Sequence, residues 1–165
     1  MRLAAAVAAA IVLGGSASGQ AQAPTLRFPL ELADPVKGTA VQVVAGGARL
    51  THLVFFATWC PPCLAEMTRL QELESTWGRQ GYRLVLVAVQ TRQTPERLRA
   101  FVEKDAPPGQ VLLDDHGAVQ HAAGVEDLPA HLLVAPDGTI VFRAGALADG
   151  VVPEVERRLG VRRRG

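Results

Sequence analysis

Hydrophobic positions follow two patterns along the chain, unbroken runs and helical spacing. Leu50–Ala57 and Leu84–Val89 are nearly continuous apolar runs, which is typical of strands buried on both faces of a sheet. Between these runs, apolar residues recur every three or four positions, which predicts a helix with one buried face. That face consists of Met67, Leu70, Leu73 and Trp77. The chain therefore alternates between strand and helix in its first half.

The second half repeats the alternation in shorter segments. Thr94 is suited to cap a helix that has Pro95 in its first turn and ends near Lys104. The turn Pro136-Asp137-Gly138 separates two apolar runs and predicts a β-hairpin. The other expected segments are short strands near 26–30, 40–44 and 111–113 and helices near 116–123 and 151–159. Strands that alternate with helices and close in a hairpin predict an α/β fold with a central mixed β-sheet flanked by helices.

The start of the chain has the pattern of a secretory signal peptide. A positive Met1-Arg2 precedes the uncharged apolar run Leu3–Leu13, and small and polar residues follow it. This run is too short for a membrane span, which needs about 20 residues. We expect residues 1–21 to be a signal peptide and 22–165 to be one domain exported to a bacterial periplasm. The alternative interpretation is an alanine-rich helix that belongs to the fold.

Composition narrows the function classes. The chain has 165 residues, a length that suits one domain. Its formal net charge is only +1, so it has no strong positive potential to attract the phosphates of a nucleic acid. Its two cysteines are too few for a disulfide-stapled miniprotein or a Cys-only metal cluster. We therefore expect no cofactor and no metal site. One dithiol pair remains.

The two cysteines form a Cys-x-x-Cys motif where the first buried run gives way to a helix. At the start of a helix, Cys60 can be a thiolate stabilised by the helix dipole and by free backbone N–H groups. Cys63 is about one turn further and can close a disulfide with Cys60. Half of a zinc site can look the same, but the chain has no second cysteine pair.

The segment Phe55–Met67 (FFATWCPPCLAEM) resembles the exported TlpA/ResA/CcmG-like thiol–disulfide oxidoreductases, which have the thioredoxin fold. Gly124–Pro129 is similar to the loop that carries the cis-proline of that family, and Leu132–Val141 to the hairpin that follows. The resemblance covers about residues 26–160. It implies a thioredoxin-like fold with extra N-terminal strands and an inserted strand–helix unit at Thr94–Leu113.

The resemblance also implies roles for individual residues. Cys60 is expected to attack the partner disulfide, and Cys63 to resolve the mixed disulfide. If Pro129 is cis, the backbone of Leu128 lies beside Cys60, where it can pair with a substrate strand. Trp59 is expected at the rim of the dithiol, with plain packing as its alternative.

Glu66 matches the acid that the family has in this helix. It follows Cys63 by three residues and lies close to the same helical face, which suits proton transfer with Cys63. The alternative is a solvent-facing acid that favours the helix N-terminus. Plain thioredoxins have a buried Asp where this chain has Val54, and many relatives have a kinking proline where it has Thr68, so a straighter helix is expected. We interpret His131 as a strand histidine, with a position that reaches the site as the alternative.

Two prolines between the cysteines indicate a reductant. Pro61 and Pro62 remove two N–H donors near Cys60, and no basic residue lies between the cysteines. A less stabilised thiolate makes the couple more reducing. The expected function is therefore a periplasmic disulfide reductase.

The resemblance also suggests partners for such a reductase. Its substrates would be protein disulfides such as those of apocytochrome c or copper-site proteins, and a membrane electron donor of the CcdA/DsbD type would recharge it. A copper-binding metallochaperone that uses both cysteines and a histidine is the alternative function. A peroxidase is disfavoured, because Thr58 precedes Cys60 by two residues and not by the three of peroxiredoxins.

Overall fold

The computed structural model describes residues 25–26, 30–44 and 46–161. The expected signal peptide lies outside the described residues. The strands are β1 (Glu31–Ala33), β2 (Ala40–Gln42), β3 (Leu50–Phe56), β4 (Tyr82–Val89), β5 (Gln110–Asp114), β6 (Ala130–Val134) and β7 (Ile140–Ala144). The helices are α1 (Pro61–Ala65), α2 (Met67–Trp77), α3 (Pro95–Asp105), α4 (Ala118–Ala122) and α5 (Val151–Leu159), with a 3-10 turn at Gly78–Gln80.

A mixed sheet forms the centre of the molecule. Its strand order is β2-β1-β5-β4-β3-β6-β7. The middle strands β3, β4 and β5 are parallel, whereas β6 and β7 on one side and β1 and β2 on the other are antiparallel to their neighbours. Every residue of β3 is buried, as its continuous apolar run predicts. The predicted α/β class and mixed sheet are therefore confirmed.

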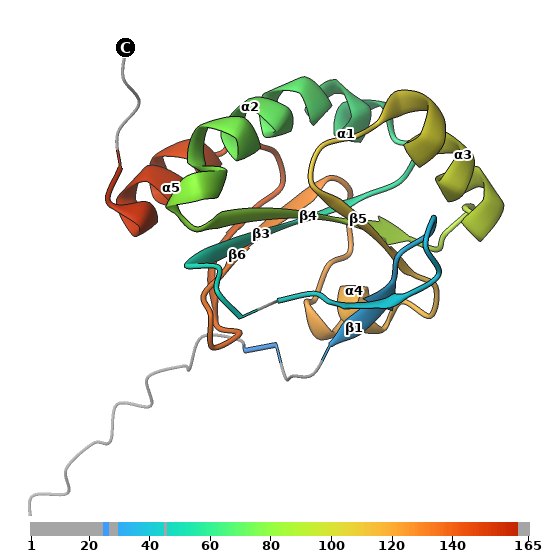
Figure 1. The fold of residues 1–165 in the computed structure, drawn as a ribbon, viewed down its shortest axis with the longest axis horizontal. Helices are drawn as coiled ribbons and strands as arrows, with labels where there is room; N and C mark the ends of the chain where they lie inside the picture. The colour runs from blue at the N-terminus through green and yellow to red at the C-terminus, as the bar shows by residue number, and fades with distance from the viewer. Residues whose placement is uncertain (1–24, 27–29, 45, 162–165) are drawn as a thin grey trace, which may run out of the picture.

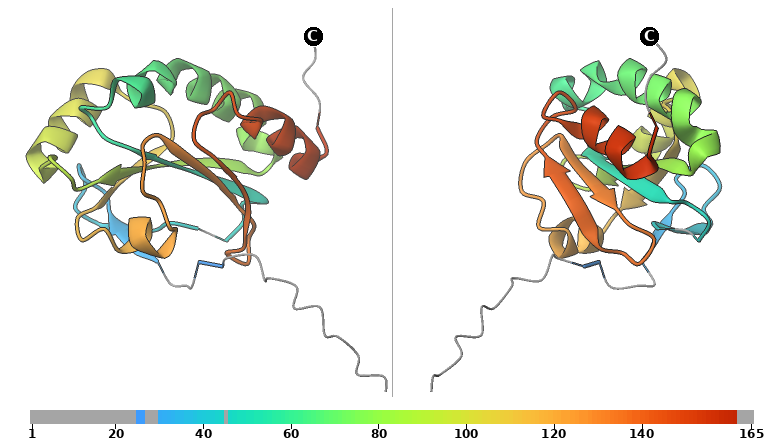
Figure 2. Two further views of the ribbon diagram at one scale, coloured as in Figure 1. Left: turned by 180° about the vertical axis from the view of Figure 1, so that it is seen from behind. Right: turned by 90° about the vertical axis from the view of Figure 1, so that its left-hand side faces the viewer.

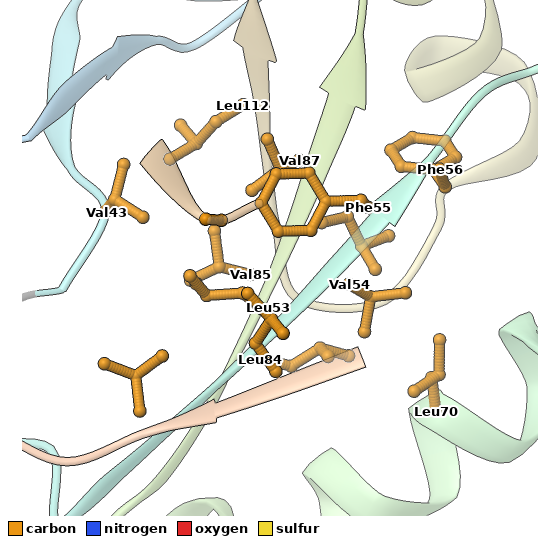
Figure 3. Close-up of a cluster of buried hydrophobic side chains, with 14 of the residues drawn as sticks. Val43, Leu53, Val54, Phe55, Phe56, Leu70, Leu84, Val85, Val87 and Leu112 are labelled. Atoms are coloured by element: carbon orange, nitrogen blue, oxygen red, sulfur yellow. The ribbon is translucent and has the colours of Figure 1, made fainter. Parts of the chain in front are cut away.

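Helices cover both faces of the sheet. Figure 1 shows α1, α2, α3 and α5 on one side of the sheet and α4 on the other. The two further views in Figure 2 show α5 next to the β6–β7 hairpin. Core side chains from β3, β4, β5 and α2 gather around the middle strands (Figure 3). This core packs around β3, whose end leads directly into the segment that carries the cysteines.

The helix after the cysteines is not straight, which corrects the expectation drawn from Thr68. The first segment, α1, ends at Ala65 and α2 begins at Met67, so Glu66 interrupts the helix without any proline. The backbone N–H of Glu66 turns back to the carbonyl of Cys63. At this interruption the carboxylate of Glu66 is bonded by groups outside the helix.

The chain start differs in one respect from its predicted strands. Residues 27–29 of the strand expected near 26–30 lie outside the described residues, and the first strand of the sheet is β1, at Glu31–Ala33. The nearby Leu26 donates its N–H to the carbonyl of Gly138. Thr25 also pairs with Thr139, so this segment adds to the tip of the β6–β7 hairpin. Among the described residues, no helix is long and apolar enough to cross a membrane.

Candidate active site

The dithiol occupies the junction between β3 and α1. Cys60 is the N-cap of α1, with extended backbone angles, and it forms a disulfide with Cys63 as predicted. Pro61 and Pro62 fill the first two helical positions and have no N–H to donate. The first amide directed at the Cys60 sulfur is therefore that of Cys63, at 3.4 Å. Cys60 is 5% exposed and Cys63 is 1% exposed, so Cys60 is the outer sulfur.

Cys60 opens onto a shallow groove. The groove has a volume of about 390 Å³, and its walls include Trp59, Pro62, Val89 and Leu128. Cys63 does not line it. The peptide bond between Leu128 and Pro129 is cis, and the groove therefore combines the outer cysteine with the residue before a cis-proline. Two residues predicted from separate parts of the sequence thus share one surface.

Trp59 forms an ordered wall of this groove. Its side chain is 40% exposed, and its indole N–H donates to the carbonyl of Thr91 at 2.8 Å. The guanidinium of Arg92 lies over the indole ring, 5.0 Å from the centroid, which is a cation–π distance. The rim position predicted for Trp59 agrees with this geometry.

Gln93 supports the segment that precedes the cysteines, a role that no sequence motif predicts. Its buried amide oxygen accepts hydrogen bonds from the backbone N–H of Thr58 at 2.7 Å and from the Thr58 hydroxyl at 2.9 Å. Because Thr58 immediately precedes Trp59, these bonds set the path of the chain into Cys60. A lone polar residue before a helix carries no pattern that would identify this role.

We expect Gln93→Ala to destabilise the chain by about 1–3 kcal/mol, because two partly buried donors of Thr58 lose their acceptor. Urea denaturation of the oxidised protein measures the change. Gln71→Ala, at an exposed position of α2, is the matched control and should change the free energy of unfolding by less than about 0.5 kcal/mol. Equal effects of the two substitutions would contradict a supporting role for Gln93.

Glu66 is held by two partners that approach its carboxylate from different elements. Oε1 accepts the backbone N–H of Leu147 at 2.7 Å, and Oε2 lies 2.9 Å from Nε2 of His131 on β6. The side chain is only 18% exposed, so the alternative of a solvent-facing helix acid is wrong. His131 is a residue of strand β6, as interpreted from the sequence, and it also reaches the carboxylate of Glu66.

A buried row of side chains continues from Glu66 across the sheet. Nδ1 of His131 lies 3.0 Å from Nε2 of His52, and Nδ1 of His52 lies 2.7 Å from the hydroxyl of Tyr82. Both histidines are fully buried, and Tyr82 is buried as well. The register explains the arrangement: His131 pairs with Val54, two residues from His52 and therefore on the same face of the sheet. We call Glu66, His131, His52 and Tyr82 the buried row.

Burial sets the electrostatics of this row. Desolvation lowers the pKa of His52 well below its usual value, and the neighbouring His131 lowers it further. Desolvation also lowers the pKa of His131, against the opposing effects of Glu66 and Asp149. The pKa of Tyr82 is raised by desolvation and by the charge of Glu74. The neutral forms of both rings and of the phenol are therefore favoured.

These lowered histidine pKa values predict acid sensitivity below about pH 6.5, the ordinary histidine value. Above that pH the histidine rings are neutral in both the folded and the unfolded chain, so protonation of the unfolded chain takes nothing from the free energy of unfolding. As the pH falls, the unfolded chain binds protons that the folded chain does not, so stability declines by up to about 1.4 kcal/mol per pH unit for each histidine. Most carboxylates titrate at lower pH.

Urea denaturation at pH 7.5 and 5.5 tests this acid sensitivity. We expect the loss between the two pH values to be smaller in His52→Leu than in the unchanged chain. His116→Gln, at an exposed histidine, is the control and should keep the full loss. A loss that is the same in all three proteins would contradict the assignment to buried histidines.

Copper binding, the alternative function, needs several metal-ligating side chains close together. Within the described residues, no group of three or more His, Cys, Asp or Glu side chains lies in an arrangement that could hold a metal ion.

Similar proteins are known for both the sequence and the fold. Over 119 residues the chain is 35% identical to the thiol:disulfide interchange protein CycY of Rhizobium leguminosarum bv. viciae, a match that covers 68% of this chain and 61% of CycY. It is 25% identical over 122 residues to the thiol-disulfide oxidoreductase ResA of Halalkalibacterium halodurans, covering 73% of this chain and 68% of that protein. The match thus spans less than two thirds of the length of CycY.

The fold comparison agrees. The thioredoxin domain of a thiol-disulfide oxidoreductase from Bacteroides vulgatus superposes with a TM-score of 0.71 at 20% identity, covering 83% of this chain and 97% of that one. This likeness shows a thioredoxin-like fold. A sequence model described as the AhpC/TSA family matches residues 20–143, which is most of the chain. On the strength of that match, the chain belongs to the AhpC/TSA family.

Proposed function

We propose that the chain is an exported thiol–disulfide oxidoreductase that reduces disulfides in other proteins. The observation that carries this proposal is the position of the cysteine pair: Cys60 caps a helix and borders an open groove, while Cys63 lies beneath it and closes the disulfide. CycY and ResA are similar in sequence to most of this chain, and their names, which describe thiol–disulfide chemistry, support the same reaction.

The reaction begins with the reduced dithiol. The Cys60 thiolate attacks one sulfur of the substrate disulfide, and the other substrate sulfur leaves as a thiolate that takes up a proton. Cys60 and the substrate are then joined by a mixed disulfide. Cys63 loses its proton and attacks the Cys60 sulfur, which releases the second substrate thiol and forms the Cys60–Cys63 disulfide present in the structure. Two electrons pass from the chain to the substrate.

The groove is suited to present an extended substrate segment to Cys60. Leu128 is half-buried and lines the same groove as Cys60, where its main chain would pair with a substrate strand laid along the groove. Pro129 sets the direction of the chain at this wall. Trp59, held by Thr91 and Arg92, closes the other side and shields the sulfur from water.

A reducing role is favoured over an oxidising one by the surroundings of Cys60. Pro61 and Pro62 provide no amide hydrogens, so the thiolate has the Cys63 N–H as its helix donor. No cationic residue lies between the cysteines. A thiolate with few stabilising contacts makes the dithiol a stronger reductant, because the reduced form is less favoured.

The cellular setting follows from the start of the chain. Residues 1–21 would direct residues 22–165 to the periplasm, where protein disulfides form and persist. Apocytochrome c and copper-site proteins are the substrates we propose, since both need reduced cysteines. A membrane donor of the CcdA/DsbD type would return electrons to the Cys60–Cys63 disulfide.

Reduction of insulin disulfides in the presence of a dithiol donor tests the activity. Residues 22–165, freed of metal, should accelerate the reaction well above the rate of the donor alone. Prior alkylation of the reduced protein at both cysteines is the control and should remove the acceleration. No acceleration by the unmodified protein, together with stoichiometric copper binding, would favour the metallochaperone instead.

A further inference from the structure

The buried row has only one hydrogen-bonding pattern in which its groups are all paired and both rings are neutral while Glu66 is a carboxylate. A carboxylate only accepts, so Nε2 of His131 must donate to Glu66. Nδ1 of His131 is then an acceptor, and the N–H at Nε2 of His52 donates a hydrogen bond to it. Nδ1 of His52 in turn accepts from the Tyr82 hydroxyl. All three hydrogens point toward Glu66.

The reverse pattern is costlier because it ends at Tyr82. If Glu66 were protonated and donated to His131, each ring would have to carry its hydrogen on Nδ1, and His52 would donate to the Tyr82 oxygen. The Tyr82 hydroxyl hydrogen would then lack an acceptor within the row, inside the core. An unpaired buried hydroxyl is unfavourable. Tyr82, on the opposite side of β3 from His131, therefore determines that the hydrogen bonds of the row all run toward Glu66.

We propose that Tyr82, His52 and His131 are positioning residues that hold Glu66 as a hydrogen-accepting carboxylate, ready to take the proton of Cys63 during resolution of the mixed disulfide. This inference deepens the proposed function and rests on it. In the balanced step, the Cys63 S–H bond breaks, its proton goes to Glu66, and the Cys63 sulfur forms its bond to Cys60 as the substrate thiolate leaves.

The row cannot carry that proton away. Nε2 of His131 already holds a hydrogen, so it cannot accept one from Glu66. The proton instead leaves Glu66 through a cavity of about 410 Å³ that Glu66 lines between α1 and α5. Other charged groups near the row are Arg69 on this cavity, Asp149 close to His131 and Glu74 close to Tyr82.

The ring tautomers test the direction of the row without any need for catalysis. Nitrogen-15 chemical shifts of the histidine rings, measured on oxidised residues 22–165 at pH 7, show which nitrogen carries a hydrogen. His52→Gln and His131→Gln identify the two buried rings among the four histidines. We expect both rings to be neutral with the hydrogen on Nε2. A charged ring, or a hydrogen on Nδ1 of either ring, would overturn the proposal.

The positioning role is tested by a single turnover of the reduced protein with one equivalent of 4,4′-dithiodipyridine. The first thiopyridone is released when Cys60 attacks, and the second when Cys63 resolves the mixed disulfide. At pH 6 we expect the second phase to be about tenfold slower in His131→Leu and in Glu66→Gln than in the unchanged chain. At pH 9, where cysteine thiols ionise unaided, the rates should converge.

His131→Gln separates positioning from packing. A glutamine amide can still donate to Glu66, so the second phase at pH 6 should stay clearly faster than in His131→Leu. A role in packing alone would favour leucine at this buried position, and equal rates for the two variants would reject the proposal. Should the leucine variant not fold, Tyr82→Phe replaces it, because only a hydroxyl is lost. A slower second phase supports the proposal, and an unchanged one overturns it.

Failure of the proposed function gives a different signature. In that case the unchanged chain would release thiopyridone without a second, intramolecular phase. The tautomers of His52 and His131 would still report on the row itself.

Discussion

Cys60→Ser is expected to reduce the disulfide reductase activity to background, and Cys63→Ser to stop the reaction one step later with the substrate still attached. Cys60 is the outer sulfur on the groove, so its loss removes the nucleophile. Cys63 is almost fully buried beneath it and does not line the groove. Without Cys63, the mixed disulfide at Cys60 has no internal thiol to resolve it.

The measurement is a trapping experiment. Each variant is incubated with an oxidised protein substrate, and the products are separated without reducing agent and identified by mass. Cys63→Ser should accumulate a covalent adduct that a dithiol releases, whereas Cys60→Ser, the matched control, should form none. Adduct on Cys60→Ser and not on Cys63→Ser would reverse the proposed roles.

Trp77→Ala is expected to cost about 3–5 kcal/mol of stability, a large share of the roughly 5–15 kcal/mol that holds a typical domain folded. Trp77 ends α2, is 1% exposed, and packs edge-on against Tyr82 with ring centroids 6.2 Å apart. Its loss leaves a cavity between α2 and β4 and removes support from the end of the buried row. Urea denaturation of the oxidised protein measures the change.

Trp59→Ala is the natural control, because Trp59 is the other tryptophan of the chain and is 40% exposed. It should cost about 1 kcal/mol or less, since its removal opens no cavity in the core. Similar losses for the two tryptophans would contradict the distinction drawn here between a core residue and a groove wall.

The fold could be predicted well because its signals are local. Three signals depend only on residues that are close in sequence: the apolar run of β3, the apolar residues every three or four positions in α2, and the N-cap at Thr94. The side chain of Thr94 accepts from the N–H of Arg97, as its position before Pro95 suggests. The break at Glu66 has no such local signal, and the partner of its carboxylate, the N–H of Leu147, belongs to a loop far along the chain.

The candidate site shows the same division. Cys60 and Cys63 were recognisable because their spacing is itself the signal. His52, Tyr82 and His131 come from three different strands, and only the register of the sheet brings them into a row. A single histidine in a buried strand has no neighbour in sequence that reveals its partner, so the row could not be predicted.

The reduction potential of the Cys60–Cys63 couple tests the central claim most directly. Metal-free residues 22–165 would be equilibrated with thiol buffers of known potential, and the reduced fraction quantified by alkylation and mass spectrometry. A reductant predicts a value near or below about −230 mV, on the thioredoxin side of the scale. A value near about −120 mV would mark an oxidant and contradict the account of Pro61, Pro62 and the weakly stabilised thiolate.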